Sequence, residues 1–172
     1  GNRNSIYNNT VTMVHGGEAI NADYADIYDN NLDTGSEHDH TTWGMHIGAS
    51  TNVYNNEIIG YDSGITSYND ANINVYDNNM EIQYNGIYGN DASGNHIYRN
   101  NTIRRVHLYG QDAGQDNWLI YTSGNIDTLL IENNDMQGAS GSGLHLHDNN
   151  NSEQTVTIVH DNIIKAEYWA GY

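Results

Sequence analysis

The chain has 172 residues, which is within the range of one domain, and 22 acidic but only five basic residues give it a formal net charge of −17. Nucleic acid and anionic membrane surfaces are therefore not expected partners, because phosphate neutralisation needs clustered Lys or Arg. No apolar stretch is long enough to span a membrane, so membrane insertion is not expected either.

A short motif recurs along the chain, with the pattern Ile or Val, Tyr, any residue, Asn or Asp, any residue, and an apolar residue. In chain order its copies occupy residues 6–11, 27–32, 53–58, 75–80, 97–103, 131–136 and 158–163, and the last two copies lack Tyr. Steps between successive Asn or Asp positions are 21, 26, 22, 22, 34 and 27 residues. A period of about 22 residues with insertions is typical of one turn of a β-solenoid.

Between these copies lies a second pattern, a Gly followed by alternating apolar positions, at residues 44–47, 64–66, 86–88 and 143–146. Two short strands per repeat, each with period-2 alternation, exclude a helical repeat. We therefore predict an all-β, right-handed parallel β-helix of about seven coils. We expect one domain over residues 1–172, a segment of a larger protein that continues N-terminally, because Ile6-Tyr7 begins the repeat without a cap. We expect Tyr168-Trp169 to terminate the stack.

Stacked coils place equivalent residues in columns. The predicted inward column is Ile6, Ile27, Val53, Val75, Ile97, Ile131 and Ile158. The predicted turn column, joined by side-chain amides, is Asn9, Asn30, Asn56, Asn78, Asn100, Asn134 and Asp161. The predicted outward column is a stripe of five rings, Tyr7, Tyr28, Tyr54, Tyr76 and Tyr98. This stripe could stabilise neighbouring strands or stack against sugar rings.

The Gly-led strands predict a second outward face that is rich in His and Tyr. If Met45 and Ile47, Val106 and Leu108, and Leu144 and Leu146 point inward, the outward residues include His46, Tyr68, Tyr88, His107, Tyr109, His145 and His147. Such groups can transfer protons and stack on sugars. Three predicted insertions frame this face, residues 33–42, 110–128 and 148–154, and Trp43 and Trp118 could add stacking surfaces at its edge.

The Asn-x-apolar turn and the Gly-Ile strand resemble those of the parallel β-helix repeat (pectate-lyase-like) superfamily over essentially the whole chain. Within it, the Asn-rich, Cys-free character looks like the disaggregatase-related β-helix domain of methanogenic archaea, a matrix-polysaccharide family. The resemblance implies a polysaccharide partner and a substrate groove on the His- and Tyr-rich sheet. It also supports an extracellular or cell-surface location.

Candidate catalytic residues lie on the same predicted face. A lyase or epimerase needs a base and a group that neutralises a uronate carboxylate, and His107 or Tyr109 with Arg104 or Arg105 upstream supplies both. His145 is a further candidate base. A glycosidase would instead use two carboxylates, for which Asp62 and Asp112 are conceivable.

Metal sites are a separate hypothesis. His145 and His147 share one strand face and could chelate one ion, and residues 37–40 (Glu-His-Asp-His) offer similar ligands. The 22 carboxylates make Ca²⁺ the one cofactor that the composition suggests.

Two classes of function remain open from the sequence. One is a module that recognises a polysaccharide, either without cleaving it or with cleavage as a lyase or a glycoside hydrolase. The other is a non-catalytic structural or adhesive β-helix, in which the Tyr and Asn columns provide stiffness. A third hypothesis, a copper-accessory role, depends on the His content alone.

Overall fold

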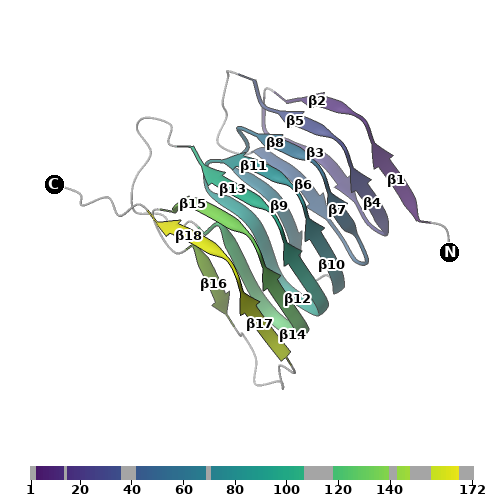
Figure 1. Cartoon of the computed structure of the whole chain (residues 1–172). Coiled ribbons are helices and arrows are strands. Elements are labelled where there is room, and N and C mark those ends of the chain that lie inside the picture. The colour runs from purple at the N-terminus through teal and green to yellow at the C-terminus, as the bar shows by residue number, and fades with distance from the viewer. Residues whose placement is uncertain are drawn as a thin grey trace.

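The computed structural model describes residues 3–13, 15–35, 42–68, 71–106, 118–139, 143–147 and 156–166. All regular structure in these residues is β-strand, and every strand pairing is parallel. The strands form a stack of coils, with β1 at one end and β17 and β18 at the other (Figure 1). The chain is therefore a parallel β-solenoid, which is the predicted fold class.

The coils present three faces, built from an eleven-stranded and a seven-stranded sheet. The seven-stranded sheet comprises β2 (Thr10–Thr12), β5 (Asn31–Asp33), β8 (Glu57–Ile59), β11 (Asn79–Ile82), β13 (Thr102–Arg105), β15 (Asp135–Ala139) and β18 (Ile163–Ala166). One part of the larger sheet contains β1 (Asn4–Tyr7), β4 (Ala25–Tyr28), β7 (Asn52–Tyr54), β10 (Ala71–Tyr76) and β17 (Val156–His160). The other part contains β3 (Gly17–Ala22), β6 (Thr42–Ile47), β9 (Ser63–Tyr68) and β16 (Leu144–His147).

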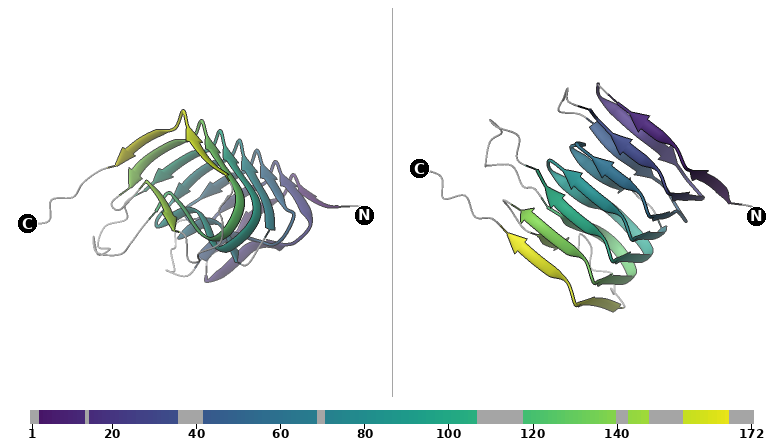
Figure 2. Two further views of the ribbon diagram at one scale, coloured as in Figure 1. Left: turned by 90° about the horizontal axis from the view of Figure 1, so that it is seen from below. Right: turned by 45° about the horizontal axis from the view of Figure 1, so that its top comes forward.

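Two long strands join these two parts. β12 (Asn85–Arg99) and β14 (Ile120–Glu132) each run along both of them, with register shifts between Gly89 and Ala92 and between Gly94 and Asn95. Seen close to the stack axis, equivalent strands and turns lie one behind another (Figure 2). The number of complete coils is slightly lower than the seven predicted, because among the described residues β17 and β18 have no third strand in their coil.

The core is a set of apolar columns that run the length of the stack. The column of the first strands is Ile6, Ile27, Val53, Val75, Tyr98, Ile131 and Val159, according to the strand register. Two members of the predicted column, Ile97 and Ile158, were wrong, and Tyr98 and Val159 take their places. At the fifth and seventh copies the inward residue lies one position later than predicted, so the fully buried Tyr98 takes the inward place and Ile97 is only partly buried.

The turn between the first and second strands of each coil contains an Asn ladder, defined as Asn9, Asn30, Asn56, Asn78, Asn101, Asn134 and Asn162. Each side-chain amide and backbone N–H donates to Oδ1 of the ladder Asn in the next coil; for Asn56 and Asn78 both distances are 3.0 Å. The residue before each ladder Asn has a positive φ, from 54° to 57°. Asn100 and Asp161, predicted for this column, are such residues, and Asn101 and Asn162 form the ladder instead.

The outward Tyr stripe is present but shorter than predicted. Tyr7, Tyr28, Tyr54 and Tyr76 stack face to face at centroid distances of 4.9–5.0 Å and interplanar angles of 2–5°. Arg99 takes the next outward place, with its guanidinium carbon 5.1 Å from the Tyr76 ring centroid. Tyr98 does not belong to the stripe because it points into the core.

Candidate functional site

The outer face of β6, β9, β12, β14 and β16 carries a continuous series of contacting rings, here called the aromatic band. Its members are Trp43, His46, Tyr68, Tyr88, Trp118, Tyr121, His145 and His147. Beneath the band lie the buried side chains of Met45, Ile65, Ile87 and Ile120. Because side chains alternate along a strand, the inward direction of these residues turns the rings at neighbouring positions outward.

The centre of the band is a tight cluster of four rings. Tyr88 and Tyr121 face each other across β12 and β14 in register, with ring centroids 4.7 Å apart. Trp118 lies 4.6 Å from Tyr121 and 6.3 Å from Tyr88, and its backbone N–H donates to Asn85. His145, paired with Tyr121 on β16, lies 5.1 Å from Trp118. Two Tyr, one Trp and one His therefore form one aromatic surface.

Several ring pairs of the band are inclined to one another, unlike the pairs of the Tyr stripe. The His46–Tyr68 pair is inclined by 64°, Tyr68–Tyr88 by 58° and Trp118–His145 by 69°. In the stripe, by contrast, the interior rings use both faces on neighbouring tyrosines. Tyr88 and Tyr121 do stack, at 13°, but the inclined rings on either side of them do not cover one another's faces, so these rings have aromatic faces and edges for a ligand.

At the β3 end of the band, His46 belongs to a polar cluster. Its Nδ1 lies 2.9 Å from Oε1 of Glu18, while Oε2 of Glu18 accepts from Asn21 at 2.5 Å. The hydrogen bond from His46 is the main cause of a lowered Glu18 pKa. Because the ionised carboxylate only accepts hydrogen bonds, the proton of a neutral His46 lies on Nδ1 and Nε2 keeps its lone pair.

Two hydroxyl groups of the band, those of Tyr68 and Tyr88, are held in the protonated form. Burial raises the pKa of both Tyr68 and Tyr88, because desolvation disfavours the phenolate. For Tyr88, nearby Tyr121, Tyr68 and Asp91 raise it further. Tyr68 and Tyr88 therefore present phenolic O–H groups on the band, and a neutral His46 presents an acceptor at Nε2.

Seven predicted site residues lie together in this band: Trp43, His46, Tyr68, Tyr88, Trp118, His145 and His147. Sequence reasoning missed two contributors, Tyr121 and Glu18. Tyr121 fell inside the predicted 110–128 insertion, but residues 120–128 belong to β14. The alternation Trp118-Leu119-Ile120-Tyr121 was the available signal.

Arg105, which was predicted to act together with a base on this face, does not lie on the aromatic band. Arg105 ends β13 of the seven-stranded sheet, where its Nε donates to the carbonyl of Gln83 at 2.6 Å and burial lowers its pKa. Val106 follows β13 and is 44% exposed, so it does not begin an inward alternation as predicted. His107 and Tyr109 lie outside the described residues, and the column place between Tyr88 and His145 belongs to Tyr121.

All five Lys and Arg residues lie away from the aromatic band. Arg99 ends β12 but stacks over Tyr76, and Arg3 pairs with Asp26 at 3.3 Å. Arg104 and Arg105 lie on β13, and Lys165 on β18. The charged carboxylate of Glu18 is therefore next to the band without any fixed cation on it, which is unfavourable for an anionic ligand.

The described part of the structure does not bring together the side chains that the metal-site and paired-carboxylate hypotheses require. Within the described residues, no group of three or more His, Asp or Glu side chains could hold a metal ion. Residues 37–40, Asp112 and Asp148 lie outside this part of the chain. Asp62 is buried, and its Oδ2 accepts from the backbone N–H of Thr42 at 3.1 Å.

Within the described ranges, no helix is long and apolar enough to cross a membrane. No protein-family model matches the sequence, and no curated protein or solved structure is significantly similar to it.

Proposed function

We propose that the chain is a polysaccharide-binding β-helix and that a neutral glycan lies along the aromatic band. The observation that carries this proposal is the unbroken series of contacting Trp, Tyr and His rings across five neighbouring strands, in which Tyr88 and Tyr121 stack and most other pairs are inclined. Four spacings of about 4.8 Å give it a length of roughly 19 Å along the stack axis. This length suits an extended chain of several sugar rings.

The chemistry of the band supports a neutral rather than an acidic glycan. Tyr and Trp rings stack on the apolar faces of sugars, and phenolic O–H groups donate to sugar oxygens. His46 Nε2 can accept from a sugar hydroxyl, since Glu18 holds the other ring nitrogen as the donor. A uronate chain would meet the Glu18 carboxylate and no Lys or Arg.

The setting proposed for this function is outside the cell or at its surface, where matrix and cell-wall polysaccharides occur. The same proposal includes the resemblance to the disaggregatase-related domains, because that family and the proposed setting both indicate a matrix polysaccharide. It is supported by the Asn-rich, Cys-free repeat and by the parallel coil architecture.

Affinity electrophoresis tests this proposal. The chain is run in native gels that contain glucans, mannans, galactans or uronic-acid polymers, the last with and without Ca²⁺. We expect retardation by at least one neutral polysaccharide, and loss of that retardation in Trp118→Ala. Retardation only by uronic-acid polymers would overturn the neutral class, and retardation by none of the polymers would overturn glycan binding.

The second candidate function is a structural or adhesive segment. It is favoured by the Asn ladder and by the stacked Tyr stripe, whose interior rings have neighbours on both faces, because both features stiffen the stack. A chain of this kind would bind no polymer in the gels, and replacing Trp118 would have no effect on its migration.

A further inference from the structure

Next to the ring cluster of the aromatic band, a short polar stretch interrupts a column of rings. Strand register and hydrogen bonding place four residues in this column, in the order Tyr68, Asn90, Ser123 and His147. The neighbouring column carries the stacked pair Tyr88 and Tyr121 on the same two strands, β12 and β14. Asn90 therefore lies beside the rings of the band, with Tyr68 before it and His147 after it along the stack axis.

Strand β12 has a bulge at this place, in which Asn90 and Asp91 together lie opposite Ser123 of β14. Simple alternation from Asn90 would turn Asp91 toward the core. Instead Asp91 has a positive φ of 53° and is exposed, whereas the residues on either side of the pair are buried. Asp91 also lies near the hydroxyl of Tyr88, because it contributes, after burial and two neighbouring tyrosines, to the raised pKa of that group. The bulge thus keeps two successive polar side chains on the outer face.

Ser123 holds this polar pair in place. Its Oγ donates to Oδ1 of Asn90 at 3.0 Å and accepts from the backbone N–H of Asp91 at 3.2 Å. Because Ser123 is fully buried, it cannot touch a ligand itself. The hydrogen bond to Oδ1 fixes the amide of Asn90, so that Nδ2 donates to Oδ2 of Asp91 at 3.2 Å and keeps a second hydrogen. An acceptor and a donor therefore lie side by side.

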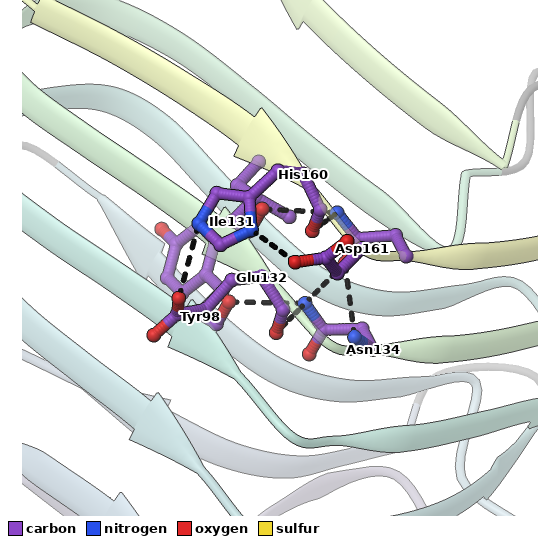
Figure 3. A network of polar contacts seen from close by, with 7 residues as sticks. Tyr98, Ile131, Glu132, Asn134, His160 and Asp161 are labelled. Atoms are coloured by element: carbon purple, nitrogen blue, oxygen red, sulfur yellow. Dashed lines mark hydrogen bonds and ion pairs between the residues drawn. The ribbon is translucent and has the colours of Figure 1, made fainter.

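The carboxylate of Asp91 is less occupied than other carboxylates of the same sheet. In the network around His160, Glu132 lies 3.1 Å from Nε2 and Asp161 lies 2.8 Å from Nδ1, so each carboxylate has an imidazole partner (Figure 3). Among the described residues, Asp91 accepts a hydrogen bond from Asn90 alone. An ionised carboxylate has about four acceptor sites, so those that remain on Asp91 can bind a ligand.

We propose that Asn90 and Asp91 form a sugar-binding subsite that selects glycans with two adjacent free hydroxyl groups on each ring. One hydroxyl donates to the carboxylate of Asp91 and its neighbour accepts from Nδ2 of Asn90, while the sugar packs against Tyr88 and Tyr121. The hydrogen bond to the carboxylate is charge-assisted, and such bonds are roughly twice as strong as neutral ones. This inference rests on the proposed binding of a glycan to the aromatic band, and it makes Asp91 a specificity-determining residue.

The subsite predicts which linkages the band accepts. A hexose polymer linked through O4 keeps two adjacent free hydroxyls, on C2 and C3, in every ring. A polymer of the same sugar linked through O3 has free hydroxyls on C2, C4 and C6, and no two of these carbons are adjacent. A uronate chain is disfavoured here as it is at Glu18, because Asp91 repels its carboxylates. We therefore expect neutral polymers linked through O4 to bind and those linked through O3 not to bind.

Affinity electrophoresis followed by isothermal titration tests the subsite. Native gels contain polymers of glucose, mannose or galactose, each sugar in an O4-linked and an O3-linked form, and we expect retardation only by O4-linked polymers. With the retarding polymer, Asp91→Asn and Asp91→Gly should each bind at least about tenfold more weakly. Both new residues tolerate a positive φ. Asp77→Asn is the matched control with an unchanged Kd, because Asp77 is exposed with a φ of 57° but belongs to the turn of the Asn ladder.

Failure of the subsite can be told apart from failure of the proposed function. If Trp118→Ala loses binding while both Asp91 variants keep wild-type affinity, the subsite is overturned and the band still binds the glycan. Equal retardation by O3-linked and O4-linked polymers, or an equal loss in Asp91→Asn and Asp77→Asn, also overturns the subsite. If no neutral polymer retards the wild-type chain, both the subsite and the proposed function are overturned. Circular dichroism checks that every variant folds.

Discussion

The hydroxyl of Tyr98 donates to Nδ1 of His96 inside the core, with the two atoms 3.0 Å apart and both side chains fully buried. Nε2 of His96 lies 2.9 Å from the carbonyl oxygen of Ser93, which can only accept, so Nε2 carries the proton and Nδ1 is the acceptor. Burial also raises the pKa of Tyr98, so its O–H stays protonated. The pair explains how a Tyr can occupy an aliphatic column.

Tyr98→Phe should destabilise the chain. The substitution keeps the ring but leaves Nδ1 of His96 without this donor, and a buried polar atom that loses its partner costs about 1–3 kcal/mol. For a chain of this length, 1 kcal/mol corresponds to a change in Tm of about 2–4 °C. Thermal unfolding followed by circular dichroism measures the change, and an unchanged Tm would contradict the assigned hydrogen bond.

Tyr61→Phe should have the opposite sign. Tyr61 is also fully buried, but its hydroxyl has no hydrogen-bond partner among the described residues. Burial, with a smaller contribution from Asp33, raises the pKa of Tyr61 to about 12. Removing an unsatisfied hydroxyl should raise the free energy of unfolding by about 1 kcal/mol. Urea titrations of Tyr61→Phe and Tyr98→Phe side by side test this, and equal losses in both would contradict it.

The Tyr98 column shows how far the sequence predicts this fold. The repeat predicted the parallel coils and five of the seven ladder positions, because both its period and its Asn residues can be read directly from the sequence. It failed at Ile97 and Asn100 because the motif Ile-Tyr-x-Asn can be read in two registers there. Only the pairing with β10 and β14 places Tyr98 inward and makes Asn101 the ladder residue. The sequence indicates this shift, because the apolar residue Ile103 comes one position later in its copy than in the other copies.

The site was predictable to a similar extent. Alternation along single strands placed His46, Tyr88 and His145 on one face, and the structure joins them into one band. Tyr121 was missed because an interval of 34 residues between repeat copies was interpreted as an insertion. Glu18 was missed because its partner His46 belongs to another coil, and pairing across coils depends on register.

Asn78→Ala should be among the most destabilising single changes in the chain. Nδ2 of Asn78 donates to Val53, Tyr76 and Asn101, and Oδ1 accepts two hydrogen bonds from Asn56. Several buried partners lose their bonds together, so we expect a loss of about 3 kcal/mol or more. The neighbouring exposed Asn79→Ala is the control, with a change within about 0.5 kcal/mol. Equal losses in the two variants would contradict the role of the ladder.

The pair of Glu18 and His46 predicts an acid-sensitive part of the stability. The pKa of Glu18 is lowered below its usual 4.5, chiefly by the His46 hydrogen bond, so the folded state binds its proton less tightly than the unfolded state. The contribution is complete above pH 4.5 and is lost as the pH falls through the lowered pKa. Between about pH 5 and pH 3, the stability of Glu18→Gln should therefore fall less than that of the wild type. Parallel acid-unfolding curves would contradict the assignment.

Under the proposed function, the glycan binds to the aromatic band and not to exposed aromatic surface in general. Isothermal titration of the retarded polysaccharide into Trp118→Ala and Tyr54→Ala tests it most directly, since Tyr54 is an outward ring of the Tyr stripe. We expect at least about tenfold weaker binding for Trp118→Ala, equivalent to about 1.4 kcal/mol, and an unchanged Kd for Tyr54→Ala. Wild-type affinity in Trp118→Ala, or an equal loss in both variants, would contradict it.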